Sequence, residues 1–555
     1  MCGIWAVFGS EDDVSVQCHA VHKIGHRGPD AFRIENINHF QNCCLGFHRL
    51  SIVDDMRGMQ PMRLYTHPTI WLIYNGEIYN HKLLDKDFEL NVSTDCDGEP
   101  IIHLYDKLGP EGMAAQLDGV FAFCIMDIAN RKVILGRDTY GVRPLFRMHT
   151  GDNGFLGVCS EGKGLLGLSH GPSKDGSING IEPFPPGHVE VYKLDSQGRA
   201  TLESSKCFNK PGQIPMYRTL ASLDSNKNMK ENIRTLFEAA VSKRLMADRR
   251  VGCMLSGGLD SSVVAALLVK QSKELGIPYP IQSFAIGMKN SPDLKAARKV
   301  ADHLGTEHHE VIFTAEEALD AIPDVIYKLE SYDITTVRAS VGMYLISKYI
   351  KTKTDTTVVL SGEGADELAQ GYIYFHNAPS AEKADVESRR LLKDLYMYDV
   401  LRGDRTTAGH GLEIRVPFLD HQFTSYYLSL SAEDRQPKEG VEKHLLRSSF
   451  DDGKLLPRDI LWRPKEAFSD GIASAEKSWF QIVQEHCDTK INDTELEGVK
   501  KKYPHNTPRT KEALFYRKTF EKTFPTKGHW IPYMWMPKWV STDDPSARTL
   551  KHYKQ

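Results

Sequence analysis

Two contrasting patterns of apolar and polar residues divide the chain. Up to about Tyr192, apolar runs of strand length predominate, and turn-forming Gly, Asp and Asn residues separate them. Such runs include Thr69–Tyr74, Gly119–Asp127 and Lys132–Gly136. This pattern predicts packed antiparallel sheets in the first part of the protein.

In the second part, strand-length apolar runs alternate with helical patterns. An alternation of this kind is typical of a parallel, doubly wound sheet. Ser291 is placed to cap the N-terminus of one predicted helix, and Gly305 is placed to end it. The predicted strands are Val251–Leu255, Ile281–Ile286, His309–Phe313 and Thr356–Leu360. One predicted helix begins at Asp260, and another covers Asp293–Leu304.

The domain boundary is expected where regular patterning stops. The segment Asn209–Asn228 is polar, irregular and contains Pro and Gly, and Ser169–Gly180 has the composition of a surface loop. We therefore predict a first domain over residues 2–192, a linker over 193–228, a second domain over 229–530 and a C-terminal tail over 531–555.

Composition narrows the class of protein. The chain of 555 residues is 41% hydrophobic and 26% charged, and it contains no apolar run near the ~20 residues that span a bilayer. Glu11, Asp12 and Asp13 interrupt the N-terminal region before a secretory signal could form. The ten cysteines include no C-x-x-C pair and no metal-ligand spacing. The net charge of −4 gives no electrostatic basis for binding nucleic acid. We expect a cytosolic protein with reduced thiols, without a membrane or nucleic-acid partner.

Cys2 is the first candidate for chemistry. If the initiator Met1 is removed, the α-amine of Cys2, with a reference pKa of about 7.7–8.0, can take the proton of its own thiol, with a reference pKa of about 8.5. The alternative is that a small residue at position 2 merely permits removal of methionine. The residues around Cys2 must show whether it is a nucleophile or has no catalytic role.

A glycine-rich turn follows the first predicted strand of the second part. Residues 255–262 read Leu-Ser-Gly-Gly-Leu-Asp-Ser-Ser, so backbone N–H groups and the positive end of a helix converge where an anion can bind. The alternative is an ordinary glycine-rich strand-to-helix turn, and the sequence is not a Walker A loop. A companion segment, residues 361–367, follows another predicted parallel strand. Acidic residues in both segments suggest Mg²⁺ held by Asp260 and Asp366.

Both parts of the chain resemble known families. The Ser-Gly-Gly-Leu-Asp-Ser turn is similar to the pyrophosphate loop of adenine nucleotide α-hydrolases. Segments resembling class II glutamine amidotransferases are Cys2–Ile4, His26–Asp30, Arg49–Asp54 and Tyr74–Asn80. Together the two parts resemble the glutamine-hydrolysing asparagine synthetases of animals from Cys2 to Arg548. The resemblance implies an N-terminal αββα sandwich like that of Ntn hydrolases, followed by a doubly wound parallel-sheet synthetase domain with extra helices.

For the first domain, the resemblance implies hydrolysis of glutamine. Cys2 would attack the side-chain amide and release ammonia, and the Asn75 side chain with the Gly76 N–H would bind the oxyanion. Arg49 would hold the substrate carboxylate. The α-ammonium group would be bound by Glu77 and by Asp97, which is chosen over Asp95 because it directly precedes Gly98. The glutamine site implied in this way comprises Arg49, Leu50, Ser51, Ile52, Val53, Asn75, Gly76, Glu77 and Asp97.

For the second domain, the resemblance implies that aspartate reacts with Mg-ATP to give β-aspartyl-AMP and pyrophosphate, and that ammonia then yields asparagine and AMP. Glu363 would serve formation of the adenylate, and Lys465 would contact phosphate. Aspartate would be bound through Thr335, Thr336 and Arg338. The implied ATP site comprises Leu255, Ser256, Gly257, Gly258, Asp260, Ser261, Ile286, Ser361 and Gly362. Ala365 stands where relatives often carry serine, a change that leaves a loop lined by backbone usable.

The same resemblance implies an internal route for ammonia and a homodimer. Two other functions remain open at this point. One is an enzyme that adenylates a different carboxylate, including the β-lactam-forming relatives, although those typically lack the nucleophilic cysteine. The other is a catalytically silent amino-acid sensor, which would not need Cys2, Asn75, Asp260, Glu363 and Lys465 together.

Overall fold

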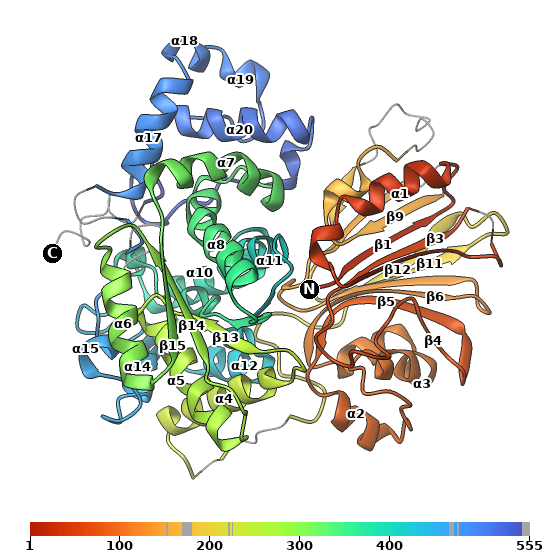
Figure 1. Ribbon diagram of the computed structural model, residues 1–555, viewed down its shortest axis with the longest axis horizontal. Coiled ribbons are helices and arrows are strands. Elements are labelled where there is room, and N and C mark those ends of the chain that lie inside the picture. The colour runs from red at the N-terminus through yellow and green to blue at the C-terminus, as the bar shows by residue number, and fades with distance from the viewer. Residues whose placement is uncertain are drawn as a thin grey trace. The chain divides into compact units, whose positions relative to one another are not determined.

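The computed structural model describes residues 1–40, 42–150, 154–168, 180–219, 223–224, 226–465, 471–473 and 477–546 (Figure 1). The loop predicted over Ser169–Gly180 lies outside these residues except for Gly180. The chain forms two compact units, and the first comprises Met1–Thr219 with the short segments Met246–Arg249 and Ala408–Leu412. None of the helices in the described ranges is both long and apolar enough to cross a bilayer.

Two antiparallel six-stranded sheets form the first unit. In spatial order, the first sheet consists of β10 (Ile181–Pro183), β8 (Phe146–Thr150), β9 (Phe155–Cys159), β1 (Gly3–Phe8), β3 (Cys44–Arg49) and β2 (Ala31–Asn36). The second consists of β12 (Ala200–Cys207), β11 (His188–Leu194), β7 (Lys132–Arg137), β6 (Gly119–Asp127), β5 (His67–Ile78) and β4 (Met62–Leu64).

The apolar faces of the two sheets form a shared core. Ile4, Phe47, Ile73 and Leu156 are fully buried in one cluster that draws on both sheets. Helix α1 (Val14–His22) lies on the outer side of the first sheet, and α2 (His81–Phe88) and α3 (Glu99–Gln116) lie on the outer side of the second (Figure 1). Alternate residues of a strand point to opposite faces, so the second sheet also packs against α3. The expected αββα sandwich is confirmed.

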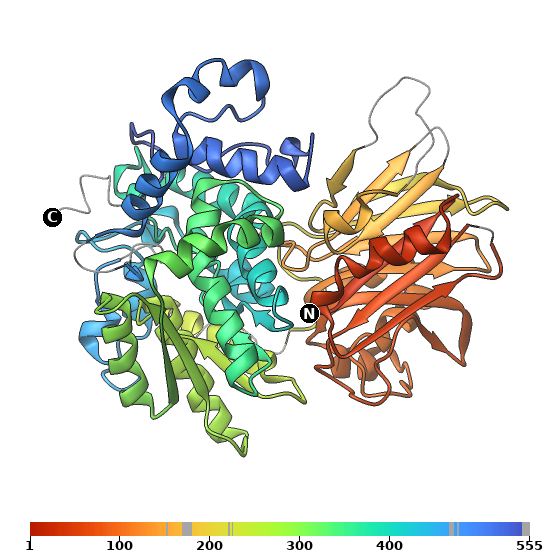
Figure 2. The ribbon, with the colours of Figure 1, turned by 45° about the horizontal axis from the view of Figure 1, so that its top comes forward.

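A five-stranded parallel sheet forms the centre of the second unit. Its order is β15 (Glu307–Ile312), β14 (Gln282–Gly287), β13 (Val251–Met254), β16 (Val358–Leu360) and β17 (Glu413–Arg415). Helices lie on both faces, with α6 (Pro292–Leu304) and α8 (Ile334–Lys353) on opposite sides of β14 (Figure 2). The doubly wound sheet is confirmed. The predicted caps of α6 are also confirmed, because the Ser291 side chain accepts from the Leu294 N–H and Gly305 has φ 70°.

The order of strands brings two loops together. β13 and β16 are parallel neighbours, so the segments that follow their carboxyl ends meet at one edge of the sheet.

The remaining helices of this unit are α4 (Met229–Ser242), α5 (Leu259–Glu274), α7 (Ala315–Leu329), α9 (Ala365–Leu368), α10 (Ala381–Asp394), α11 (Asp399–Ala408), α12 (His421–Ser429), α13 (Ala432–Arg435), α14 (His444–Ser449), α15 (Arg458–Leu461), α17 (Trp479–Lys490), α18 (Asp493–Leu496), α19 (Val499–Lys502) and α20 (Lys511–Thr523).

The boundaries differ from the prediction in two places. Strand β12 falls inside the predicted linker, yet it pairs with β11 and completes a sheet of the first unit. Its residues are mostly exposed because it is an edge strand, and their polarity therefore resembles that of a linker. The second difference is residues 531–546, predicted as part of a tail. Their Trp535 packs into an aromatic cluster with Tyr374 and Phe375 of the second unit.

Candidate active sites

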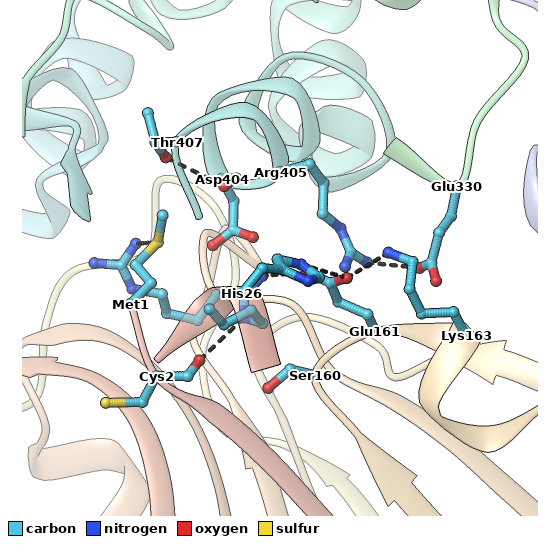
Figure 3. Close-up of polar contacts among 12 residues, drawn as sticks. Met1, Cys2, His26, Ser160, Glu161, Lys163, Glu330, Asp404, Arg405 and Thr407 are labelled. Atoms are coloured by element: carbon cyan, nitrogen blue, oxygen red, sulfur yellow. Dashed lines mark hydrogen bonds and ion pairs between the residues drawn. The ribbon is translucent and has the colours of Figure 1, made fainter. Parts of the chain in front are cut away.

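In the first unit, Cys2 directly precedes β1, and its thiol lies beside the backbone of Leu50. The Cys2 Sγ atom is 3.4 Å from the Leu50 nitrogen and 3.5 Å from its carbonyl oxygen. Arg27 Nε donates to the Cys2 carbonyl at 3.0 Å. The Cys2 backbone is therefore held on its carbonyl side, and the thiol, which is partly exposed, is directed elsewhere (Figure 3).

A buried ion cluster supports this anchor. The Glu161 carboxylate, with a side chain 1% exposed, accepts from Arg27 Nη1 at 2.7 Å and from His26 Nε2 at 3.2 Å, and it also pairs with Lys163 (Figure 3). A buried carboxylate is costly unless it is paired and hydrogen-bonded. Glu161 thus fixes the guanidinium that holds the Cys2 carbonyl.

The side chain of Asn75 is the strongest candidate for an oxyanion donor. Asn75 is 0% exposed on β5, and neither its Nδ2 nor its Oδ1 has a hydrogen-bond partner among the described residues. Buried amides are nearly always satisfied, so such a group is suited to a ligand. The next residue, Gly76, has φ 152°, and a Cβ there would lie 2.0 Å from the Val120 carbonyl oxygen. Only glycine fits this position, and β5 also contacts β1, the strand that Cys2 directly precedes.

The guanidinium of Arg49 closes the loop that follows β3. Its Nη1 donates to the Asp55 carbonyl at 2.8 Å and its Nη2 to the Asp54 carbonyl at 2.5 Å. Within this loop, Ser51 donates through its N–H to Asp30 at 2.8 Å. Leu50 and Ile52 are buried in the same loop, and Val53 is half-buried. Residues 49–53, which are predicted to bind glutamine, thus form one ordered loop that starts beside the Cys2 thiol.

The two candidate aspartates differ in their surroundings. Asp97 is 2% exposed and accepts from the Tyr74 hydroxyl at 2.8 Å and from the Ile78 N–H at 2.7 Å. Asp95 is exposed. Asp97 is therefore tied to β5, the strand that carries Asn75 and the buried Glu77. This placement supports the choice of Asp97, which remains a prediction.

In the second unit, a cavity of about 230 Å³ lies at the carboxyl ends of β13, β14 and β16. It is lined by most of the residues predicted for this part of the chain. They are Leu255, Ser256, Gly258, Asp260, Ser261, Ile286, Thr335, Ser361, Gly362, Glu363, Asp366 and Lys465. Gly257 does not line the cavity. It has φ +72°, and a Cβ there would lie 2.5 Å from the Ala296 carbonyl carbon, so Gly257 permits the turn and its close approach to α6.

Four charged side chains form a chain across this cavity. Lys443 Nζ lies 2.5 Å from Asp260 Oδ2 and 2.5 Å from Asp366 Oδ1, and Lys465 Nζ lies 2.6 Å from Asp366 Oδ2. Burial raises the pKa of Asp366, but the two ammonium groups outweigh this effect and hold that pKa below its usual value. The two carboxylates predicted to bind a metal are thus bridged by a lysine.

One carboxylate oxygen in the cavity is available to a cation such as Mg²⁺. The Oδ1 atom of Asp260 is buried and has no hydrogen-bond partner in the part of the chain that the structure describes. A hard cation that prefers carboxylate and phosphate oxygens fits this atom. The described residues hold no group of three or more His, Cys, Asp or Glu side chains arranged for a metal. Asp260 Oδ1 therefore suits a cation that receives its other ligands from phosphate and water, whereas both carboxylate oxygens of Asp366 pair with lysines.

Glu363 faces the same cavity and forms an ion pair with Arg402. Arg402 Nη2 donates to Glu363 Oε2 at 2.7 Å and to Asp399 Oδ1 at 2.8 Å. Burial raises the pKa of Glu363 to about 7, although Arg402 opposes the shift. A carboxyl group that titrates near neutral pH can accept or release a proton during a reaction.

Of the three residues predicted to bind the substrate aspartate, only Thr335 lines the cavity. Its Oγ1 atom is buried and has no hydrogen-bond partner among the described residues, as expected of a group that binds a ligand. Thr336 Oγ1 donates to Asp333 at 2.9 Å and helps to cap α8. Arg338 pairs with Glu512 and Asp544 instead. The structure therefore does not bring Thr336 or Arg338 to the cavity.

Comparisons with known proteins agree with this division. The Glutamine amidotransferase domain family matches residues 1–193, and the Asparagine synthase family matches residues 232–387 and 378–543. A relative from Gallus gallus, asparagine synthetase [glutamine-hydrolyzing], is 61% identical over 560 residues, covering 100% of this chain and 99% of the relative. Proteins of the same name from Homo sapiens and Cricetulus griseus are 58% and 59% identical, with the same coverage. The chain belongs to the glutamine-hydrolysing asparagine synthetase family.

Several residues of the two sites carry no clear signal in the sequence. Lys443 lies 183 positions from Asp260, and Arg402 lies 39 positions from Glu363. Neither stands in a motif, so their places follow only from the fold. Arg27 did lie within a segment that carries the family resemblance, and the polar cluster around His26–Asp30 was the available signal.

Proposed function

We propose that this asparagine synthetase makes L-asparagine from L-aspartate, with ammonia from L-glutamine, and that it consumes ATP through a β-aspartyl-AMP intermediate. The products are glutamate, AMP, pyrophosphate and asparagine. The observation that carries the proposal is the second-unit cavity, where the glycine-rich phosphate loop, paired lysines and Glu363 meet. A silent amino-acid sensor would gain nothing from this arrangement.

The first half-reaction uses Cys2 as nucleophile. Once Met1 is removed, the α-amine of Cys2 accepts the thiol proton, and Sγ attacks the glutamine side-chain carbonyl. The Asn75 amide and the Gly76 N–H stabilise the oxyanion of the tetrahedral intermediate. Its collapse breaks the C–N bond and releases ammonia, and water then hydrolyses the γ-glutamyl thioester to glutamate. The active protein must begin at Cys2, and a measurement of its intact mass checks this requirement.

The second half-reaction begins with attack of the aspartate β-carboxylate on the α-phosphorus of ATP, with pyrophosphate as leaving group. The loop around Ser256 and Gly258 binds the phosphates through N–H groups, and Lys465 and Lys443 offset their charge. Asp260 and Asp366 would hold Mg²⁺, which would offset charge on the phosphate oxygens when bound.

Ammonia then attacks the acyl carbon of the adenylate, and AMP leaves. The attacking nitrogen becomes positively charged and must lose a proton. Glu363, whose pKa is raised to about 7, accepts that proton in its carboxylate form. Arg402 keeps the Glu363 carboxylate in place. Its buried Nε atom has no hydrogen-bond partner within the described ranges and suits a carboxylate of aspartate. The enzyme takes all of its substrates from solution, which is consistent with a location in the cytosol. The family resemblance also supports a homodimer.

The test supplies purified protein with Mg-ATP and glutamine and measures pyrophosphate and amide product with and without aspartate. We expect both products only when aspartate is present. If another amino acid with a carboxylate side chain replaces aspartate, the enzyme modifies a different acceptor. If no carboxylate elicits pyrophosphate while glutamine binds, the sensor function is correct and the proposal fails.

A further inference from the structure

The last described segment of the second unit is firmly attached to the helices around the cavity. We call residues 531–546 the C-terminal strap. The Tyr533 hydroxyl donates to Asp394 at 2.5 Å, and the Tyr533 carbonyl accepts from the Tyr398 hydroxyl at 2.8 Å. Lys538 pairs with Glu387 at 2.7 Å. The strap is thus part of the packed unit, although its sequence is that of an irregular tail.

One contact of the strap is made at the N-terminal cap of α8. The Asp333 carboxylate, which is 0% exposed, accepts from the Thr336 N–H at 2.9 Å through Oδ1 and from the Trp535 N–H at 2.8 Å through Oδ2. A single carboxylate therefore joins the first turn of α8 to the backbone of the strap. Displacing the strap here would leave a buried acceptor unsatisfied, which is costly.

A second contact lies one turn further along α8. Arg338 Nη1 and Nη2 donate to the two carboxylate oxygens of Asp544 at 2.9 and 2.8 Å. Arg338 Nε and Nη2 also donate to Glu512 of α20 at 2.8 and 2.5 Å. The side chains of Arg338 and Glu512 are 4% and 1% exposed. Bidentate pairs of this kind fix geometry as well as adding energy.

These two contacts bracket the residue of α8 that faces the substrate cavity. Thr335 lies between Asp333 and Arg338, and its unpartnered Oγ1 faces the cavity. Ala339 and Met343 continue the same lining face at helical spacing. Among the described residues, Asp544 makes no hydrogen bond or ion pair with the loops that follow β13 and β16 on the ATP side. Trp535 of the strap does pack against Tyr372, which also lines the cavity, so only the Asp544 contact is confined to the α8 wall.

We propose that the C-terminal strap positions the aspartate wall of the active site, and that Arg338 acts as a positioning residue through Asp544. This inference rests on the proposed function, because it assigns the Thr335 face to aspartate. It explains why Arg338 can matter for aspartate chemistry while its guanidinium is fully occupied outside the cavity.

The test compares Asp544→Asn with Asp543→Asn. Asp543 is the exposed neighbour in the strap. It forms no ion pair with Arg338 and does not line the substrate cavity, so it serves as the control. Losing the charged pair lets the first turn of α8 move, and misplacement by about 1 Å costs up to about 100-fold. We expect Asp544→Asn to raise the KM for aspartate about tenfold. The KM for Mg-ATP and the glutaminase rate should change less than about twofold, and Asp544→Glu should recover part of the loss. Asp543→Asn should match the unaltered enzyme.

Arg338→Lys, alone and together with Asp544→Asn, separates positioning from direct binding. If Arg338 acts through Asp544, the double variant is little worse than either single variant. If the effects on the KM for aspartate add in the double variant, and Arg338→Lys has much the larger effect, Arg338 binds aspartate itself. That result overturns the proposal. An unchanged aspartate KM in Asp544→Asn, or equal rises in both KM values, also overturns it. If Asp544→Asn does not fold, as judged by lost glutaminase activity, the same comparison is made with Asp544→Glu. Unaltered enzyme without aspartate-dependent pyrophosphate release would instead refute the proposed function.

Discussion

Replacing Arg402 with glutamine is expected to move the pH dependence of asparagine formation to higher pH. Arg402 donates to Glu363 at 2.7 Å, and both groups are largely withdrawn from solvent, with side chains 8% and 15% exposed. The guanidinium favours the charged carboxylate and so opposes the rise in the Glu363 pKa that burial causes. Glutamine removes the positive charge and is a shorter, uncharged hydrogen-bond donor.

The magnitude follows from the strength of the pair. A hydrogen bond to a charged group contributes about 1.5–3 kcal/mol, and one pKa unit corresponds to about 1.4 kcal/mol. Losing the charge should therefore raise the Glu363 pKa by about one to two units, from about 7 to about 8–9. The carboxylate is the form that accepts a proton from the attacking nitrogen. Activity should thus rise with pH through the pKa of Glu363, and the rising limb should shift upward in the variant.

The assay measures asparagine formation with ammonia, saturating Mg-ATP and saturating aspartate, without glutamine. Free ammonia, rather than total ammonium, is held constant at each pH so that its own titration does not enter the profile. Arg435→Gln is a matched control, since Arg435 is 2% exposed and pairs with Asp385 at 2.5 Å outside the cavity lining. The control should lose thermal stability and keep the original pH profile. A midpoint that stays near 7 in Arg402→Gln, or moves to lower pH, would refute the role assigned to this pair.

Three further changes test other parts of the two sites. Cys2→Ala should abolish use of glutamine and keep asparagine formation from added ammonia, and loss of both activities would contradict two separate sites. Asn75→Ala should lower the glutaminase kcat by about 10²–10³-fold through loss of an oxyanion donor, whereas a change confined to KM would mean that Asn75 only binds substrate. Lys443→Met should raise the KM for Mg-ATP about tenfold, with the exposed Lys454→Met as control, and an unchanged pyrophosphate release rate at low ATP would remove Lys443 from phosphate binding.

The fold was predictable where residues carry a periodic pattern. Strands β13, β14 and β16 are short apolar runs between helices, and their parallel arrangement follows from that alternation. Strand β12 was not predicted, because most of its residues are exposed and only its pairing with β11 reveals it. Residues 531–546 were assigned to a tail for a similar reason. Their attachment depends on single contacts such as Trp535 with Asp333, which leave no periodic signal.

The active site was predictable where its residues are close in the chain. Ser256, Gly258 and Asp260 form one turn, so the chemistry of a phosphate loop is visible in the sequence. Arg338 shares a segment with Thr335 but does not line the cavity. Along α8, Thr335, Ala339 and Met343 recur every four residues and line the cavity. Arg338 falls outside that row, and its partners come from the far end of the chain.

The charges of the synthetase cavity explain why lysines stand where a metal was expected. Asp260 and Asp366 would repel each other and the anionic substrates, but Lys443 bridges them and Lys465 pairs with the second. Half-buried carboxylates in close proximity need such partners. If Asp260 and Asp366 held Mg²⁺ with ATP, the same two ammonium groups would be available to phosphate oxygens. The two lysines thus offset the charge of Asp260 and Asp366, and this requirement accounts for their place in the site.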